Sequence, residues 1–322
     1  MGITKFKLKV ETPTNVGSGA MEPRYLIRKS KDGKFLKIFD ANTVIDYLVQ
    51  NKMTKSIEYL KSGERTIEFP DNLKHRKLSI YNPSNFRETM LNTFIRNSQG
   101  PYIPGSTIKG ALKLAFLFHD ASESLINQLL QINYGRNKNK ELFDRTKVLV
   151  THSKAVKELK NFEKRFIELF QFIKISDVQF SEDDLCAVQV TRGSPMTFEC
   201  LKPGAEGTVR IIFDELIDQL EFNFDHREFL NRVFDFYKKV KEFENKQKFL
   251  NIKKGNLKIG RTGVHSKTLF LKVIQLPGSL SERYLRLFPR PRKSVRTRDD
   301  PLKTFYRVGN MPLGWVTLEE LV

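Results

Sequence analysis

Cysteine and tryptophan are nearly absent from this chain of 322 residues, which contains two Cys and one Trp. Cys186 and Cys200 form no C-x-x-C pair, and the five histidines are spread along the chain without an H-x-x-x-H or a Cys/His group. Structural zinc sites draw their ligands from such short spacings. The sequence therefore predicts no metal site and no cofactor, and so few thiols fit a reducing compartment.

Long apolar runs are also missing. No segment approaches the roughly 20 apolar residues that a membrane-spanning helix needs. The first residues, MGITKFKLKVE, alternate between apolar and polar side chains, whereas the core of a signal peptide is continuously apolar. We therefore expect a cytoplasmic protein that does not use a membrane.

Familiar catalytic motifs are lacking as well. There is no G-x-S-x-G segment. Asp183 and Asp184 are adjacent but lie in a polar stretch with no nearby partner residue that would shift the pKa of either carboxyl for catalysis. The segment GSTIKG at 105–110 resembles a P-loop but is followed by Ala111 in place of the phosphate-binding lysine. We predict no catalytic residue. An endoribonuclease remains the alternative, with His265 as its candidate because this histidine lies in a basic, Gly-rich context.

Positive charge is what the chain has in excess. Lys and Arg number 56 against 37 Asp and Glu, a net charge of +19, which favours a polyanionic partner. The segment 283–298, RYLRLFPRPRKSVRTR, holds seven cations and no acid, interleaved with Tyr284 and Phe288. A solvated face normally mixes charges of both signs, and Arg binds phosphate and stacks on bases. We therefore interpret this segment as an RNA contact made by Arg290, Arg292 and Lys293.

Strand and helix patterns mix in both halves of the chain. Strands are predicted at 5–11, 25–27, 35–39, 173–180, 185–190, 196–201, 208–213, 257–259 and 268–274, and helices at 86–95, 106–119 and 225–249. A further helix is expected to begin at a cap formed by Asp40 or Asn42 and to run to about residue 50. The segment 52–82 is expected to be irregular, and 125–172 a charged helical insertion. We predict an α+β protein of two ferredoxin-like units, 1–170 and 171–322, with the strand order left open.

Three further segments are candidates for RNA contacts, and each has a purely structural alternative. Gly17, Ser18 and Gly19 follow the first strand, where their backbone can approach a phosphate or form an ordinary turn. Ser106 and Lys109 open a helix, whose free amides suit either a phosphate or simple capping. The loop after strand 257–259 combines flexible backbone with cations and hydroxyls, and its candidates are Gly260, Arg261, Gly263, Ser266 and Lys267.

These segments, in this order, resemble the RAMP superfamily of CRISPR proteins. The matching pieces are VETPTNVGSG, YIPGSTIKGALK, FIKISDVQF, MTFECLKPGAEGTVRIIF, GRTGVHSKT and the closing MPLGWV, spread over nearly the whole chain. The IPGS-x-x-KGA segment is fairly specific for the superfamily. PLGW and the ISD strand are similar to the subunits found at the 3′ end of the guide RNA in type III-A (Csm) complexes.

The resemblance implies a modified RNA-recognition fold that binds the 3′ part of the guide RNA and contacts the adjacent Csm backbone subunit. It also implies support of guide maturation by positioning host nucleases. By position, Gly17–Gly19, Ser106, Lys109, Gly260–Gly263, Ser266 and Lys267 would lie near RNA or a neighbouring subunit. In the superfamily, the backbone subunit cuts target RNA with a loop aspartate. Here that region reads as strand, turn and strand with Asp32 in the turn, so that activity is not expected.

Overall fold

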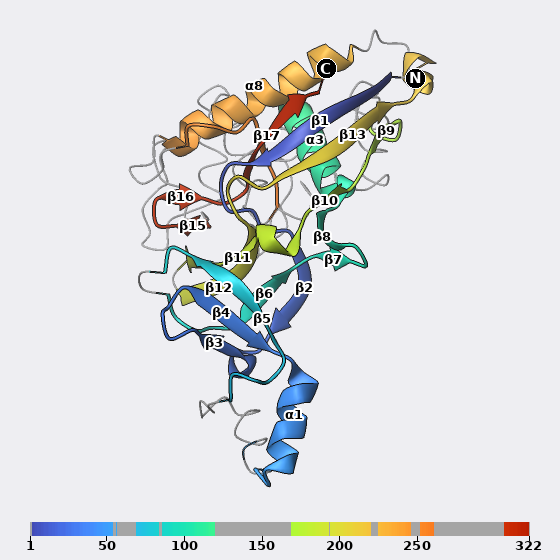
Figure 1. Cartoon of the computed structure of the whole chain (residues 1–322). Helices are drawn as coiled ribbons and strands as arrows, with labels where there is room; N and C mark the ends of the chain where they lie inside the picture. The colour runs from blue at the N-terminus through green and yellow to red at the C-terminus, as the bar shows by residue number, and fades with distance from the viewer. Residues whose placement is uncertain are drawn as a thin grey trace, which may run out of the picture.

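The computed structural model describes residues 2–53, 56, 69–83, 86–119, 169–192, 194–219, 225–245, 252–260 and 306–321. The molecule is elongated, with a helix-covered sheet at one end, a second large sheet in the middle and helix α1 (Ala41–Gln50) at the other end (Figure 1). Both termini lie at the helix-covered end (Figure 1).

The sheet at that end, called here the terminal sheet, has five strands, and all neighbouring strands in it are antiparallel. Their order across the sheet is β14 (Leu257–Lys258), β17 (Trp315–Glu320), β1 (Gly2–Val10), β13 (Glu206–Phe213) and β9 (Ile173–Ile175). In β1, Phe6, Leu8 and Val10 are buried while the lysines between them face outward, which is the period-two pattern of a half-buried strand.

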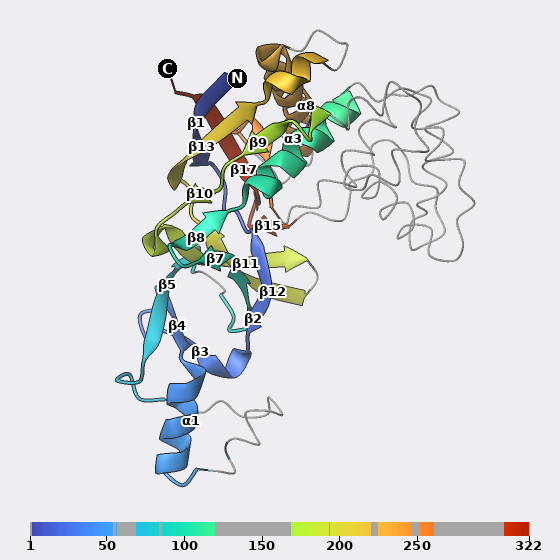
Figure 2. The ribbon, with the colours of Figure 1, turned by 90° about the vertical axis from the view of Figure 1, so that its right-hand side faces the viewer.

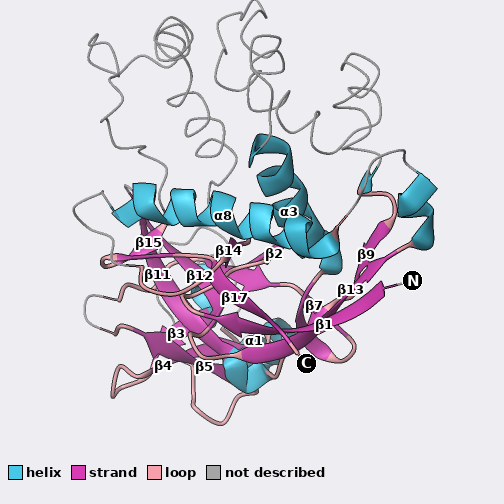
Figure 3. Ribbon diagram, turned by 90° about the horizontal axis from the view of Figure 1, so that it is seen from above, coloured by secondary structure: helices cyan, strands magenta, loops and turns pink. Residues whose placement is uncertain are grey.

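Two helices, α3 (Gly105–His119) and α8 (His226–Asn245), cover one face of the terminal sheet (Figure 3). They pack on each other, and the buried hydroxyl of Tyr237 on α8 donates to the carbonyl of Ala111 on α3 at 3.1 Å. In chain order the elements run β1, α3, β9, β13, α8, β17. With β17, β1, β13 and β9 side by side, this is the antiparallel ferredoxin-like arrangement.

The second large sheet, called here the inserted sheet, is built mainly from the segments between β1 and α3 and between β9 and β13. Its main path runs β2 (Gly17–Glu22), β6 (Leu91–Phe94), β12 (Ser194–Leu201), β11 (Leu185–Arg192), β5 (His75–Tyr81), β4 (Phe35–Phe39) and β3 (Ile27–Lys29). Strands β15 (Arg307–Val308) and β16 (Met311–Pro312) join it through β11. It mixes parallel and antiparallel pairs and curls, so that β2 and β5 come to face each other (Figure 2).

A small sheet links the two large ones. It consists of β10 (Val178–Gln179), β8 (Gly100–Ile103) and β7 (Arg96–Asn97), and it delivers the chain to the start of α3 (Figure 2). Three short 3-10 helices complete the described elements: η1 (Arg24–Leu26), η2 (Glu182–Asp184) and η3 (Glu215–Gln219). The largest hydrophobic core runs continuously from the terminal sheet into the inserted sheet.

The predicted α+β, ferredoxin-like fold is confirmed by this arrangement. The strand pairs show further that each large sheet contains strands from both before and after residue 170. In the terminal sheet β1 pairs with β13, and in the inserted sheet β5 pairs with β11. The predicted boundary between 170 and 171 therefore does not separate the sheets, and the division into two sequential units stays a prediction. Most of the predicted insertion at 125–172 and the predicted strand 268–274 lie outside the described residues.

Three local predictions were wrong. The strand predicted at 25–27 is mostly the 3-10 helix η1, and of its residues only Ile27 belongs to a strand, β3. Part of the segment expected to be irregular, 52–82, forms β5, and the helix predicted at 86–95 is an extended segment that ends in β6. Met90, which would lie on the buried face of that helix, is 55% exposed. All four residues of Leu91–Phe94 are buried, because β6 lies inside the sheet between β2 and β12. A strand buried on both faces loses its alternation, and its apolar residues then mimic helical spacing.

Candidate nucleic-acid interface

The predicted Gly-rich segment is an exposed, bulged edge of the inserted sheet. Gly17 is aligned with Phe94 and Met21 with Asn92, and the register shifts between them. Ser18, Gly19 and Ala20 form this irregular stretch, and all three are exposed. Gly19 has φ +87°, and a Cβ there would meet nothing within 4 Å. Glycine is therefore needed for the backbone conformation, and the space beside it is open among the described residues.

The Ser18 hydroxyl holds this bulge together. Ser18 Oγ lies 2.7 Å from Thr93 Oγ1 and accepts a hydrogen bond from the amide of Ala20 at 3.0 Å. Thr93 Oγ1 in turn donates to the carbonyl of Ala20 at 3.2 Å. The side chain predicted to contact RNA thus shapes the backbone, and the exposed groups that remain for a ligand belong mainly to the main chain.

Helix α3 begins where the chain leaves the small sheet, and the sequence explains the sharp start. Pro104 precedes Gly105, whose amide donates to Asp177 Oδ1 at 2.8 Å. A Cβ at Gly105 would overlap the carbonyl oxygen of Ile175, so only glycine allows the helix to approach β9 this closely. Ser106 follows on the exposed side of the first turn. The dipole of a helix start favours negative groups at this end, and the Asp177 carboxylate is one of them.

Lys109 and Lys113 lie one turn apart on α3, and both are half-buried. Burial lowers the pKa of the Lys109 ammonium below its ordinary value. Burial also lowers the pKa of Lys113, and the neighbouring charge of Lys109 lowers it further. Within the described part of the chain neither ammonium has an ion-pair partner, although Lys113 Nζ lies 5.9 Å from the centre of the Phe170 ring. Two desolvated cations this close together gain from a shared anion such as a phosphate.

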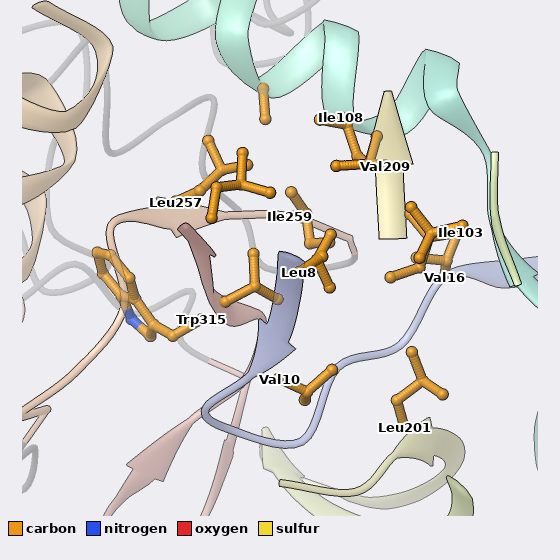
Figure 4. Close-up of a cluster of buried hydrophobic side chains, with 14 of the residues drawn as sticks. Leu8, Val10, Val16, Ile103, Ile108, Leu201, Val209, Leu257, Ile259 and Trp315 are labelled. Carbon is orange, nitrogen blue, oxygen red and sulfur yellow. The ribbon is translucent and has the colours of Figure 1, made fainter. Parts of the chain in front are cut away.

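Gly260, the last residue of its described segment, lies against the loop before β2. Its φ is +77°, and a Cβ there would overlap the carbonyl oxygen of Asn15. Figure 4 shows the apolar cluster beneath: Val16, Ile103, Ile108 and Ile259 point toward one another. These residues come from the Gly-rich segment, the small sheet, α3 and the end of β14. One buried cluster therefore lies beneath three of the segments in which RNA contacts are predicted.

The structure thus gathers Gly17, Ser18, Gly19, Ser106, Lys109 and Gly260 around a common support, although they are spread over the sequence. That they bind RNA stays a prediction. The remaining predicted contacts, Arg261, Gly263, Ser266, Lys267, Arg290, Arg292 and Lys293, lie outside the described residues, as does His265.

Three residues at this site were missed by the sequence analysis. Lys113 could have been found, because it follows Lys109 by one helical turn. Asn15 is 2% exposed and donates through Nδ2 to the carbonyl of Glu199 at 2.7 Å, while its buried Oδ1 has no hydrogen-bond partner among the described residues. Asp177 holds the first amide of α3. Nothing in the sequence signals the roles of Asn15 and Asp177, because both depend on contacts between distant segments.

The fold and the site define a class: an α+β protein of ferredoxin-like topology whose first long helix begins at a cationic, glycine-bordered surface. None of the helices in the described ranges is long and apolar enough to cross a membrane. The family model described as the RAMP superfamily matches residues 7–300, and the chain belongs to this superfamily. No curated protein sequence matches the chain.

Solved structures share the fold along the whole length. The structure described as "Crystal structure of T.onnurineus Csm5" aligns with a TM-score of 0.64 at 17% identity, covering 96% of this chain and 99% of that one. A chain of "Cryo-EM structure of Csm-crRNA-target RNA ternary complex in type III-A CRISPR-Cas system" aligns with a TM-score of 0.64 at 18% identity, covering 98% and 100%. The likeness concerns the fold, and it extends from end to end of both relatives.

Proposed function

We propose that this protein is a structural RNA-binding subunit of a type III-A CRISPR (Csm) effector complex. It binds the 3′ part of the guide RNA, contacts the adjacent backbone subunit and supports guide maturation, with host nucleases as further partners. In this role the chain binds and positions RNA and does not itself cut it.

The observation that carries this proposal is the cationic start of α3 beside the bulged strand β2, in a chain that belongs to the RAMP superfamily. Main-chain amides, Lys109 and Lys113 recognise the sugar-phosphate backbone and read no base edges, which suits a guide whose sequence varies. A fold shared along its entire length with Csm5 and with a chain of a Csm-crRNA-target RNA complex supports this place in an effector.

Charge reversal on α3 tests the RNA contact. We expect Lys109→Glu and Lys113→Glu each to weaken binding of the full chain to a fluorescein-labelled guide RNA about tenfold, since each removes a phosphate contact and adds repulsion. Lys238→Glu, at an exposed lysine of α8, is the matched control and should bind as the wild type does. Equal affinities for all four proteins in fluorescence anisotropy would refute the site.

The basic segment is tested separately. Reversing Arg290, Arg292 and Lys293 should weaken RNA binding more than reversing Lys138 and Lys140, because only the first set belongs to the acid-free, aromatic-interleaved stretch. Equal effects of the two sets would leave that assignment without support.

Two rival functions give different results with the same material. An endoribonuclease of the superfamily would cleave repeat RNA without metal, and His265→Ala would abolish the cleavage. A target-cutting backbone subunit would occur in several copies along one guide, whereas an end subunit occurs once in each purified complex. Asp32 lies in the tight turn between β3 and β4, where its carboxylate accepts a hydrogen bond from the amide of Lys34 at 3.1 Å, so this region is strand, turn and strand and we do not assign the target-cutting activity to it. Tagged protein purified from its host, with its co-eluting RNA and proteins identified, separates these possibilities.

A further inference from the structure

The inserted sheet presents a second surface with the chemistry of a single-strand RNA platform, distant from the start of α3. On β4 and β5 the residues alternate between two faces. Leu36, Ile38, Leu78 and Ile80 point into the main core. Phe35 and Lys37 on β4 and Lys77 and Ser79 on β5 therefore share the other face, with Phe35 aligned with Ser79 and Lys37 with Lys77. These four residues are called here the β4–β5 strip.

Both ends of this face are already covered. On one side, Cys186 and Val188 of β11 belong to an apolar cluster that is capped by Val308 and Leu313. On the other side, Phe39 packs with Val44 and Leu48 of α1 in a third cluster. The β4–β5 strip lies between these two clusters, and in Figure 1 strands β4 and β5 lie between β11 and α1.

Within the strip the exposed groups are one aromatic ring and several cations. Phe35 is 40% exposed, and Lys77 and Ser79 are exposed beside it. Lys31 in the adjoining β3–β4 turn is exposed and interacts electrostatically with Asp71, the partner of Lys37 on the strip. Tyr81 continues the same face of β5, with its hydroxyl directed at Met311 Sδ at 3.6 Å. An exposed ring surrounded by lysines is the arrangement on which an unpaired base stacks while its phosphates meet the cations.

The acidic residues near the strip do not neutralise all of its lysines. Asp71 pairs with Lys37 at 2.6 Å. Asp32 is held within its own turn by the amide of Lys34. Lys31, Lys34 and Lys77 make no ion pair with another described residue. Among the described residues Phe35 is also the one large apolar side chain that the strip exposes. The core of a protein interface is depleted of lysine, so an isolated ring among lysines favours RNA.

We propose that the β4–β5 strip binds a single-stranded stretch of RNA, with a base stacked on Phe35 and the adjoining phosphates held by Lys77 and Lys31. The inference rests on the proposed RNA-binding function and extends it to a second contact on the inserted sheet. A duplex does not fit this site, because its bases are already stacked on one another and do not offer a face to Phe35.

The test uses the full chain and a fluorescein-labelled, mixed-sequence single-stranded RNA of about 15 nucleotides, followed by fluorescence anisotropy. Phe35→Ala should weaken binding about tenfold, because stacking on one aromatic side chain contributes on that order. Phe35→Tyr keeps the ring and should bind like the wild type. Lys77→Glu should weaken binding, whereas Lys238→Glu on α8 should not. A 5-iodouridine RNA should form a photocrosslink to Phe35 that mass spectrometry identifies.

The outcomes separate this inference from the proposed function. If Phe35→Ala and Lys77→Glu bind as the wild type does and no crosslink forms at Phe35, while Lys109→Glu weakens binding, the strip is not an RNA site and the proposed function stands. If the wild type binds no guide RNA, both fail. If Phe35→Ala leaves RNA binding intact and releases a protein from the purified complex, the strip is a protein contact and the inference is overturned.

Discussion

The buried carboxylate of Glu199 on β12 is stabilised by hydrogen bonds and ion pairs from neighbouring strands. The side chain is fully buried and accepts hydrogen bonds from Arg96 Nη1 and from the amide of Phe94, each at 2.9 Å, and it also pairs with Arg76. Burial would raise the pKa of this carboxyl, but the hydrogen bond from Arg96 and the charges of Arg76 and Arg96 outweigh burial and hold it below the ordinary value. One carboxylate thus ties β5, β6 and β7 to β12.

Removing that charge should cost much stability. We expect Glu199→Gln to lower the free energy of unfolding by about 3 to 5 kcal/mol at neutral pH, because Arg96 and Arg76 lose a shared buried partner. Urea denaturation measures the difference. Glu206→Gln, which alters an exposed pair with Lys7, serves as the control and should change little.

The same carboxyl gives a pH dependence with a defined sign. Its folded-state pKa is depressed, so its contribution is complete above the unfolded value of about 4.3 and is lost as the pH falls through the folded pKa. The wild type should therefore lose stability on acidification more steeply than Glu199→Gln does. Parallel stability curves for the two proteins would contradict the role given to Glu199.

The two thiols should be unreactive in the native protein. Cys186 and Cys200 are aligned on β11 and β12 as free, buried cysteines. Burial raises the pKa of Cys186 to about 12 and raises that of Cys200 well above its ordinary value. The thiolate is the reacting form, so neither residue should react with Ellman's reagent at pH 8, and both should react in guanidinium. Rapid labelling of the native protein would show that the sheet opens.

At the scale of elements, the approach of α3 to β9 depends on one glycine. Gly105→Ala should destabilise the protein by about 1 to 3 kcal/mol, since the new methyl group overlaps the backbone of Ile175. Gly110→Ala in the same helix is the matched variant, because a Cβ there meets no atom of the described residues within 4 Å. It should stabilise the protein by about 0.5 to 1 kcal/mol through helix propensity. Thermal unfolding measures both changes in stability. If the two variants were both stabilised or both destabilised, the result would argue against this packing.

Most elements with a polar face were predicted well from the sequence. β1 alternates cleanly, α8 places Phe229, Val233, Phe236 and Val240 on one buried face, and Asp40 caps α1 by accepting from the amide of Thr43 at 2.9 Å. β6 failed because both of its faces are covered. β5 lay within a stretch judged irregular, although His75, Lys77, Ser79 and Tyr81 alternate with Leu78 and Ile80. Periodicity is informative only where one side of an element meets water.

At the scale of the whole molecule, the net charge of +19 predicts salt-sensitive RNA binding. If about six phosphates are contacted, a slope near 0.7 per contact means roughly a hundredfold or greater loss of affinity between about 50 and 200 mM salt. Anisotropy titrations across this range measure the slope. An affinity that hardly changes with salt would mean that the excess cations do not contact the RNA.

The candidate site was only partly predictable for a reason that applies to the whole chain. Gly17, Lys109 and Gly260 each carried a local signal, namely glycine in a turn or a cation at a helix start. No local signal indicated that these residues converge, because the apolar cluster below them is assembled from segments that are distant in sequence. The buried lysine Lys258, which pairs with Glu244 and lies 5.2 Å from the Trp315 ring, likewise follows from tertiary packing and from no local pattern.

The position of β1 between β13 and β17 has a consequence for synthesis. Phe6 is aligned with Val209 on β13 and with Glu320 on β17, so both strands that flank β1 are synthesised long after β1, and β17 is the later of the two. Until then the nascent chain carries an apolar strand with an open edge, which is a template for aggregation. Premature termination before Trp315 would leave that edge open permanently, and the truncated product would be a substrate for chaperones and proteases.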